Sequence, residues 1–318
     1  MTGGGERAKI ARMRKIQSSR TVVLFALCAN LFIAAVKFLA AFMTASSAML
    51  AEAIHSVADT MNQVLLLVGM RSGRRRPDDL HPFGFSGELY FWSFIVAIIL
   101  FTLGAVFAIY QGVHKLMHPQ AIENINYAFI VLALAIVAEG VAFYRAFKKI
   151  NKERGDCGIV AYLRKTKKSE LIVVFLEDLA ALTGLGIALV LIFIQHLTGI
   201  LVFDGIASIV IGFILAVVAL FLGNETRSLL IGESADPEII KSIGEIFKQE
   251  ESINRLIQIK SLQLGPDDIL IAVKAEFDHR LNAVEISNLI NGLEEDIRGK
   301  YPDIKKIFVE PDLYSRRF

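Results

Sequence analysis

Residues 46–70 read SSAMLAEAIHSVADTMNQVLLLVGM, and they hold His55 and Asp59 in a segment otherwise apolar enough to cross a membrane. An ionisable group at bilayer depth costs about 2.5–3.5 kcal/mol on insertion scales, so it persists where it faces protein or water. Four-residue spacing puts both groups on one face of a helix, about one turn apart. Imidazole and carboxylate together suit a divalent transition metal. We therefore expect this helix to carry a metal site inside the membrane.

The composition of the whole chain indicates a polytopic α-helical membrane protein. The 318 residues have a mean hydropathy of +0.52. Hydrophobic residues make up 54% of the chain, whereas soluble domains average about 45–50%. Cys28 and Cys157 belong to no C-x-x-C pair, so we expect neither a disulfide framework nor a zinc finger. Transmembrane helices need about 20 apolar residues, and we predict six of them, at 20–43, 48–70, 89–113, 125–147, 169–196 and 201–222.

Basic residues alternate along the connecting segments. Six lie before residue 21, four lie between the second and third spans, and eight lie from Lys148 to Lys168. The turns near 44–47 and 195–203 have none, and the third connection has Lys115 alone. By the positive-inside rule, both termini then face the cytoplasm, and we expect a multi-pass protein of the cell (inner) membrane.

Three regions follow from this pattern: a basic cytoplasmic tail at 1–19, a six-helix transmembrane domain at 20–222, and a charged cytoplasmic domain at 223–318. Asp236-Pro237 is typical of a helix start, here for residues 237–250. Period-two and helical patterns then predict strands at 255–264, 269–277 and 304–311, with a second helix near 286–297. The order αββαβ favours a small two-layer, ferredoxin-like α+β domain. Such a domain is marginal alone, so we expect it to dimerise.

Several further polar side chains lie in the predicted spans. They are Asn30, Lys37, Glu52, Asn62, Glu139, Glu177, Asp178 and Asp204. If the second and fifth spans pack together, His55, Asp59 and Asp178 can converge on one tetrahedral ion. Glu177 is then a fourth ligand or a proton acceptor beside the site.

We expect Glu52, Asn62, Asp204 and Glu139 to orient these ligands or to carry protons. The alternatives are structural. Lys37, Glu139 and Asp204 are suited to ion pairing or helix capping, and Asn62 to a hydrogen bond between helices.

Three motifs resemble the cation diffusion facilitator family. Residues 46–63 resemble its second-span signature, residues 74–92 (RRRPDDLHPFGFSGELYFW) its D-x-x-H-x-F-G-x-G-K-x-E loop, and residues 203–212 (FDGIASIVIG) its sixth-span D-P-x-A-S pattern. The L-E-D motif of the fifth span resembles the branch that includes mitochondrial zinc transporter homologues. The resemblance covers nearly the whole chain. It implies export of a divalent metal against inward protons, by a homodimer with alternating access, with His55 and Asp59 at metal-binding positions.

The chain departs from the family pattern at the fifth span and in the loop. In the fifth-span H/D-x-x-x-D pattern Asp178 matches the second position, but Val174 occupies the first. Glu177, water or another group must then complete the site. In the loop, Asp78 or Asp79 and His81 match a secondary metal site. Phe85 stands where the second histidine of that site would be, so we expect it to be weak or absent.

In the family that the chain resembles, the final strand of the C-terminal domain often carries a histidine. The final strand here has none, so a metal cluster in this domain is not expected. His279 and Asp278 are interpreted as solvated turn residues.

The predicted function is proton-coupled antiport of a divalent metal, with no resident cofactor. Metal and protons compete for His55 and the carboxylates. Mixed nitrogen and oxygen ligands favour Zn²⁺, while an oxygen-rich site admits Mn²⁺, Fe²⁺ or Co²⁺. The expected partners are the metal ion, a second copy and the lipid bilayer; the basic stretch 148–168 carries no nucleic-acid-binding motif.

Two other classes of function stay open. An intramembrane metalloenzyme would need an open zinc site with a base, such as H-E-x-x-H, which the chain lacks. We therefore predict that the chain is not an enzyme. A non-transporting metal sensor or scaffold would bind metal without moving it.

Overall fold

The computed structural model describes residues 30–122 and 124–314, which form two compact units. One unit holds the greater part of the long helices, from residues up to 67, 95–153 and 173–222. The other holds residues 68–94, 154–172 and the chain from 223 onwards. The predicted basic tail at 1–19, Cys28 and the start of the first predicted span lie outside the described residues.

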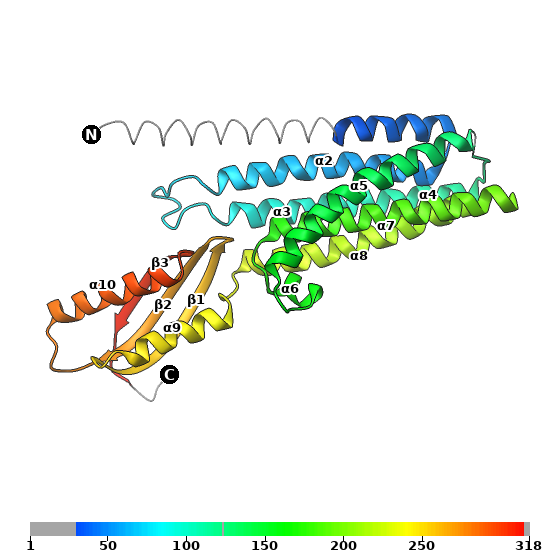
Figure 1. The fold of residues 1–318 in the computed structure, drawn as a ribbon. Coiled ribbons are helices and arrows are strands. Elements are labelled where there is room, and N and C mark those ends of the chain that lie inside the picture. Colours follow the sequence, from blue (N-terminus) through cyan, green and yellow to red (C-terminus); the bar gives the residue numbers. More distant parts are fainter. Residues whose placement is uncertain (1–29, 123, 315–318) are drawn as a thin grey trace, which may run out of the picture. The chain divides into compact units, whose positions relative to one another are not determined.

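Four helices in the described residues are long and apolar enough to cross a membrane. The first, Glu88–Met117, is built from α3 (Glu88–Ile99), the π-helical turn η1 (Leu100–Val106) and α4 (Phe107–Met117). The others are α5 (Ile125–Glu153), α7 (Ser169–Thr198) and α8 (Val202–Ile231). The short α6 (Ile159–Lys165) follows α5 and precedes α7 along the chain, as the labels in Figure 1 mark.

Two more helices stand at predicted spans but do not meet both criteria. The first predicted span is described from Asn30 to Thr44, as a shorter apolar helix. Helix α2 (Ser47–Ser72) is long enough, but polar side chains that include Glu52, His55, Asp59 and Asn62 lower its hydropathy. The prediction of six spans is therefore confirmed for four of them.

Helices α5 and α8 extend beyond the predicted spans. The apolar segments end near residues 147 and 222, whereas α5 runs to Glu153 and α8 to Ile231. Side-chain polarity marks the edge of the hydrocarbon, but the backbone ladder continues until a residue interrupts it. In α8 that residue is Gly232, whose φ of +115° is readily adopted by glycine.

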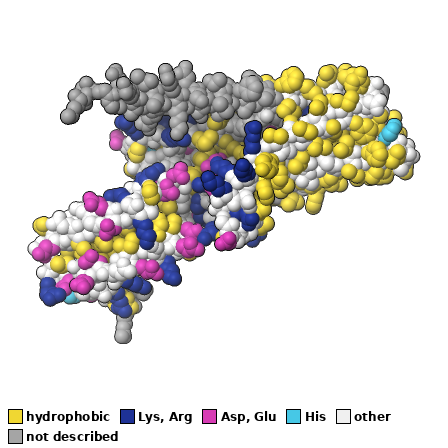
Figure 2. All heavy atoms as spheres, in the orientation of Figure 1, with side chains coloured by type: hydrophobic (Ala, Val, Ile, Leu, Met, Phe, Trp, Pro, Cys, Tyr) yellow, Lys and Arg dark blue, Asp and Glu magenta, His cyan; other side chains and the backbone are white. Residues whose placement is uncertain are grey.

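The outer surface of the helical unit is apolar. On α5, Ile130, Leu134 and Val137 are each more than half exposed. Figure 2 shows apolar side chains covering much of the visible helical surface. A contiguous apolar surface of this extent indicates that lipid, rather than water, surrounds these helices.

Helices α4 and α8 approach each other closely at glycines. A Cβ atom added to Gly112 would lie 2.6 Å from the carbonyl oxygen of Gly205 and 2.6 Å from Ile209 Cγ1. A Cβ added to Gly212 would lie 2.7 Å from Ile109 Cγ1. In lipid, helices associate through close packing of small residues and through hydrogen bonds. These glycines therefore hold the two helices in register.

Asp204, in the first turn of α8, caps the N-terminus of α2. Its Oδ1 accepts hydrogen bonds from Ser46 Oγ at 2.5 Å and from the Ala48 backbone N–H at 3.1 Å. Its Oδ2 accepts one from the Ser47 backbone N–H at 2.8 Å. Lys115 of α4 lies 3.7 Å from the same carboxylate. A helix start needs acceptors and favours negative charge, so Asp204 sets the axial position of α2.

The C-terminal domain confirms the predicted αββαβ order. It consists of α9 (Pro237–Gln249), β1 (Ile253–Gly265), β2 (Asp268–Phe277), α10 (Ala283–Lys300) and β3 (Ile304–Pro311). The sheet order is β1-β2-β3, with β1 and β2 antiparallel and β2 and β3 parallel. Alternate residues of β2, such as Ile271 and Val273, are buried in one core with Phe247 of α9 and Ile297 of α10. The helices therefore form the second layer, as the alternation predicted.

We expect Gly112→Ala to lower the stability of the helical unit. The added methyl group would meet the main chain of α8, which cannot move aside alone, and overpacking typically costs about 1–3 kcal/mol. Thermal unfolding in detergent, followed by far-ultraviolet circular dichroism, measures the change. The control is Gly186→Ala in α7, where the added methyl group meets no described atom within 4 Å apart from its chain neighbours and the nearby backbone of its own helix. Equal melting temperatures for the two variants would contradict the close approach.

Candidate metal centre

His55 and Asp59 lie one turn apart on α2, and His55 is buried. The His55 Nδ1 and Asp59 Oδ1 atoms are 3.4 Å apart, and His55 is 1% exposed. Both ring nitrogens, and Asp59 Oδ1, lack a hydrogen-bond partner among the described residues. Buried polar atoms in folded proteins are normally hydrogen-bonded, so these atoms call for a partner that the described side chains do not supply, such as water or an ion.

A hydrogen bond joins α2 to α7 at this depth. Asn62 Nδ2 donates to Glu177 Oε1 at 2.5 Å, and both side chains are buried. The neighbouring Asp178 is half-buried. The second and fifth predicted spans are therefore packed together, which is the condition that the predicted metal site required. Asn62 has the interhelical hydrogen bond that was one of its two expected roles.

Carboxylates from three helices line one small cavity. Asp59 comes from α2, Glu139 from α5, and Glu177 and Asp178 from α7. The remaining lining residues are Asn30, Ile33, Ser56, Gln63, Ala138, Ala142 and Val174. The cavity volume is about 70 Å³, which is enough for an ion and a few water molecules. Four acids around so small a space make it suited to a cation.

The tetrahedral ligand set predicted from the sequence is not assembled in this arrangement. His55 does not line the cavity. No three His, Cys, Asp or Glu side chains within the described ranges are close enough to hold an ion together. Joining His55 to Asp59 and Asp178 therefore requires side-chain rotation or a shift of α2 against α7. The acids Asp59 and Asp178 already line one cavity, whereas His55 does not.

Val174 lines the same cavity, one turn before Asp178. A ligand at that position would therefore face the site, as the H/D-x-x-x-D pattern implies. In this chain the position contributes an apolar wall instead. Glu177, on the same helix, also lines the cavity.

Lys37 links the first described helix to α2 and α5. Its Nζ lies 3.4 Å from Glu52 Oε2 and 3.6 Å from Glu139 Oε1, and it donates to Ser56 Oγ at 2.7 Å. Lys37 is 1% exposed and Glu52 is fully buried. A buried charge is tolerated when it is paired and hydrogen-bonded. The lysine therefore offsets two carboxylates, one of which also lines the cavity.

Sequence reasoning missed two cavity residues, Ser56 and Gln63. Asn30 Nδ2 donates to Gln63 Oε1 at 3.0 Å, so this amide pair closes one side of the cavity. The available signal was spacing, because Ser56 and Gln63 lie three residues before and four residues after Asp59 and so share its helix face.

Asp204 lies apart from this cavity. It caps α2 near Ser47, and Asp59 is twelve residues further along, or about 18 Å at 1.5 Å per residue. Its carboxylate oxygens are occupied by the hydrogen bonds of the cap. These contacts are those of a helix cap, which was one of the structural alternatives that the sequence offered for Asp204.

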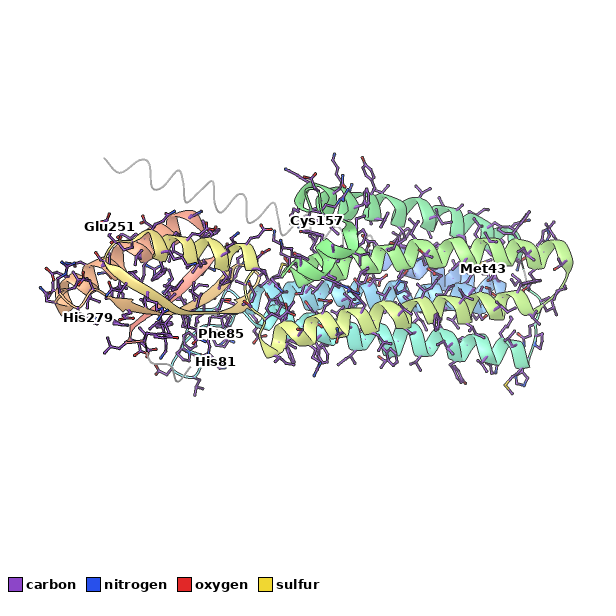
Figure 3. All side chains as sticks on the ribbon, turned by 90° about the horizontal axis from the view of Figure 1, so that it is seen from below. Met43, His81, Phe85, Cys157, Glu251 and His279 are labelled. Atoms are coloured by element: carbon purple, nitrogen blue, oxygen red, sulfur yellow. The ribbon has the colours of Figure 1, made fainter. Side chains whose placement is uncertain are left out.

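The loop residues Asp78, Asp79 and His81 are exposed. His81 Nδ1 lies 3.0 Å from Asp78 Oδ1, and the His81 ring lies 4.4 Å from the Phe85 ring (Figure 3). Partial desolvation acts to raise the pKa of Asp78, but hydrogen bonds from the backbone and ring of His81 outweigh it and lower the pKa. The third position is thus filled by an apolar ring, and a weak or absent site stays a prediction.

In the C-terminal domain, His279 is exposed in the turn after β2 (Figure 3). Its neighbour Asp278 accepts hydrogen bonds from Arg280 on both carboxylate oxygens. These bonds lower the pKa of Asp278 to about 2. The acid is committed to an ion pair within its turn.

Comparison with known proteins gives a consistent result. Residues 23–231 match the model of the cation efflux transmembrane domain. The chain is 33% identical over 262 residues to a protein of Homo sapiens named proton-coupled zinc antiporter SLC30A9, mitochondrial, which covers 82% of this chain and 46% of that relative. It is 32% identical over 267 residues to metal tolerance protein C4 of Arabidopsis thaliana, covering 83% and 58%.

A bacterial relative matches over almost its full length. Manganese efflux system protein MneP of Bacillus subtilis (strain 168) is 25% identical over 301 residues, covering 94% of this chain and 97% of that protein. In contrast, the chain spans about half the length of the human relative.

We expect Lys37→Met to destabilise the helical unit, because it leaves Glu52 and Glu139 without the ammonium group. Removing one partner of a buried ion pair typically costs about 3–5 kcal/mol. Thermal unfolding in detergent measures the loss. The double variant Lys37→Met/Glu52→Gln should recover part of it, because one uncompensated carboxylate is then removed. A double variant no more stable than Lys37→Met would show that Lys37 and Glu52 are not coupled.

Proposed function

The chain belongs to the cation efflux family, and on that premise we propose that it exports a divalent metal cation from the cytoplasm in exchange for protons. The resemblance predicted from the sequence motifs is confirmed by the family match. The family consists of transporters and not of enzymes, so the metalloenzyme alternative is not retained. The observation that carries the proposal is the cavity at which Asp59 of α2 meets Glu177 and Asp178 of α7.

We propose that the chain spans the membrane six times and that both termini lie in the cytoplasm. We further propose that the membrane is the cell (inner) membrane. Four long apolar helices, together with the start of the family match at residue 23, support this count. In this proposal the helix that reaches Thr44 is the first span and α2 is the second. The alternation of basic loops supports the orientation.

We propose His55, Asp59 and Asp178 as metal ligands, with Glu177 as the fourth ligand or as a proton acceptor. Metal binding at cytoplasmic pH displaces protons from these groups, because ligands bind metal in their deprotonated form. A shift between α2 and α7 then opens the site to the other side. There, a more acidic medium returns protons to the ligands and releases the ion.

The charge balance of the cavity region supports coupling to protons. Glu52, Asp59, Glu139, Glu177 and Asp178 carry five carboxylates, and Lys37 carries one ammonium. Full ionisation would leave a net charge of −4, and one divalent ion would reduce this only to −2. Buried charge of that size is costly, so part of the balance must come from protons.

We propose Zn²⁺ as the first candidate cargo and Mn²⁺ as the second. Mixed imidazole and carboxylate ligation suits Zn²⁺, and the human relative is named a zinc antiporter. The surplus of carboxylates also suits Mn²⁺, and the full-length bacterial relative is named a manganese efflux protein. Fe²⁺ and Co²⁺ can also bind imidazole and carboxylate ligands, but neither the ligand set nor the names of the relatives favour them.

We further propose that the protein acts as a homodimer within the lipid bilayer. The C-terminal domain has fewer than 100 residues, and small domains bury little of their own surface. It exposes apolar side chains of Val284, Phe308 and Leu313. A second copy of the domain would cover such groups.

We expect Asp59→Ala to abolish metal flux while the protein still folds. The variant removes a cavity carboxylate from α2 without touching the Asn62–Glu177 hydrogen bond. Proteoliposomes with an imposed pH gradient, loaded with a metal-sensitive dye, measure flux of Zn²⁺, Mn²⁺, Fe²⁺ and Co²⁺ in parallel. The control is Asp156→Ala in the exposed segment between α5 and α6, which should transport as the unmodified protein does. Undiminished flux in Asp59→Ala would refute the assignment, and metal binding without flux in the unmodified protein would favour a sensor.

We expect Asp178→Asn to weaken metal binding more than Glu177→Gln. Glu177 is held by Asn62, whereas no such bond ties the Asp178 carboxylate in the described structure. Isothermal titration of the purified protein with Zn²⁺ gives both affinities. Loss of one charged ligand should weaken binding by about tenfold or more, since 1.4 kcal/mol is a factor of ten. The reverse order would make Glu177 the ligand and Asp178 its neighbour.

A further inference from the structure

Two exposed histidines lie one turn apart where α4 ends. Helix α4 closes at Met117, and its C-cap residue His118 donates its backbone N–H to the His114 carbonyl oxygen at 2.9 Å. The two imidazole rings have centroids 4.9 Å apart and planes inclined by 34°. Both side chains are exposed. They belong neither to the central cavity nor to the loop motif.

We propose that His114 and His118 together bind one divalent transition metal ion at a second site. Two Zn–N bonds of about 2.0–2.1 Å at a near-tetrahedral angle place the ring centroids about 5 Å apart. The observed centroid separation of 4.9 Å is compatible with both rings binding one ion. Neutral imidazole is the commonest protein ligand for such metals.

The surroundings of the pair favour a cation. The C-terminal end of a helix carries partial negative charge, which stabilises a nearby positive charge. Lys115 lies between the two histidines in sequence, but its side chain is buried. Its ammonium donates to the Ala45 carbonyl oxygen at 2.6 Å and lies 3.7 Å from Asp204. That charge is therefore held inside the protein and not presented to the pair.

The pair adjoins an open pocket. His114 lines it together with Gln111, Lys115 and Gln120, and its volume is about 310 Å³. Water or a small ligand can therefore reach an ion held there and fill its remaining coordination positions. Structural zinc sites use four protein ligands, so a site with two is exchangeable.

The chemistry of this site differs from that of the central cavity. Imidazole nitrogen favours Cu²⁺, Ni²⁺, Zn²⁺ and Co²⁺, whereas carboxylate sites also accept Mn²⁺. The two histidines lie at the same end of the helical unit as the start of α2. Met43, which precedes α2, marks this end in Figure 3. If the topology proposed above holds, this is the release side of the membrane. The pair would then take up exported ions on that side, a role that rests on the proposed function, whereas the binding itself does not.

A purely structural role makes a different prediction. Histidines near a helix C-terminus also stabilise the helix when protonated. That role needs neither two rings at chelating distance nor a metal, and it predicts no nitrogen-coordinated ion at this end of α4.

The test is Cu²⁺ binding to the purified full-length protein in detergent, followed by electron paramagnetic resonance. We expect a signal with coupling to two imidazole nitrogens. Either His114→Gln or His118→Gln should weaken binding at this site by about tenfold or more, because the second ligand acts at high effective concentration once the first is bound. Excess Mn²⁺ should not displace the ion.

Two matched controls separate this site from other histidines and from the transport site. His196→Gln changes an exposed histidine near the end of α7, whose ring packs against Phe129, and should leave the signal unchanged. Asp59→Asn should also keep the signal, so that failure of the transport proposal and failure of this one are distinguishable. Binding to His114→Gln and His118→Gln as tight as to the His196→Gln control, or coupling to a single imidazole in the unmodified protein, would overturn the proposal.

Discussion

A buried charge in a low-dielectric interior must find a partner, and the helical unit is organised around that constraint. Lys37 places its ammonium between Glu52 and Glu139 and so joins three helices through one cation. Asp59, Glu177 and Asp178 have no comparable cation in the described contacts, although Asn62 donates to Glu177. The same constraint that makes an ionisable residue expensive in lipid therefore makes the remaining acids receptive to a metal ion and protons.

The position of α2 decides whether those acids meet, and contacts far from the cavity set that position. Asp204 holds the first turn of α2 through two backbone N–H groups, and Lys115 of α4 lies near the same carboxylate. Glycines at 112 and 212 bring α4 and α8 together, so the capping residue is itself held in place. About 18 Å further along α2, Asp59 faces the cavity. A capping interaction at one end of the helix thus fixes the start of α2, and the α2 contact with α7 at the depth of the cavity is the hydrogen bond from Asn62 to Glu177.

Much of the fold was predictable because its signals are local. The alternation of Ile269 to Phe277 predicted β2, and Asp236-Pro237 predicted the start of α9, since both depend on neighbouring residues. Four membrane helices were predictable from apolar length, but α2 was harder because its functional polar residues lower its hydropathy. Helix ends were predicted less well. Hydropathy detects the edge of the hydrocarbon, whereas α8 ends where Gly232 takes a positive φ.

For the site, the sequence by itself determined which residues share a helix face: His55 with Asp59, and Val174 with Asp178. This follows from helical periodicity, which needs no knowledge of other helices. Only the tertiary structure decided that Asp59 and Asp178 face one cavity with Glu139, that His55 lies outside its lining, and that Asp204 caps α2 instead of facing the cavity. These outcomes depend on the rotation and axial shift of one helix against another. Side-chain spacing along a single helix carries no information about either.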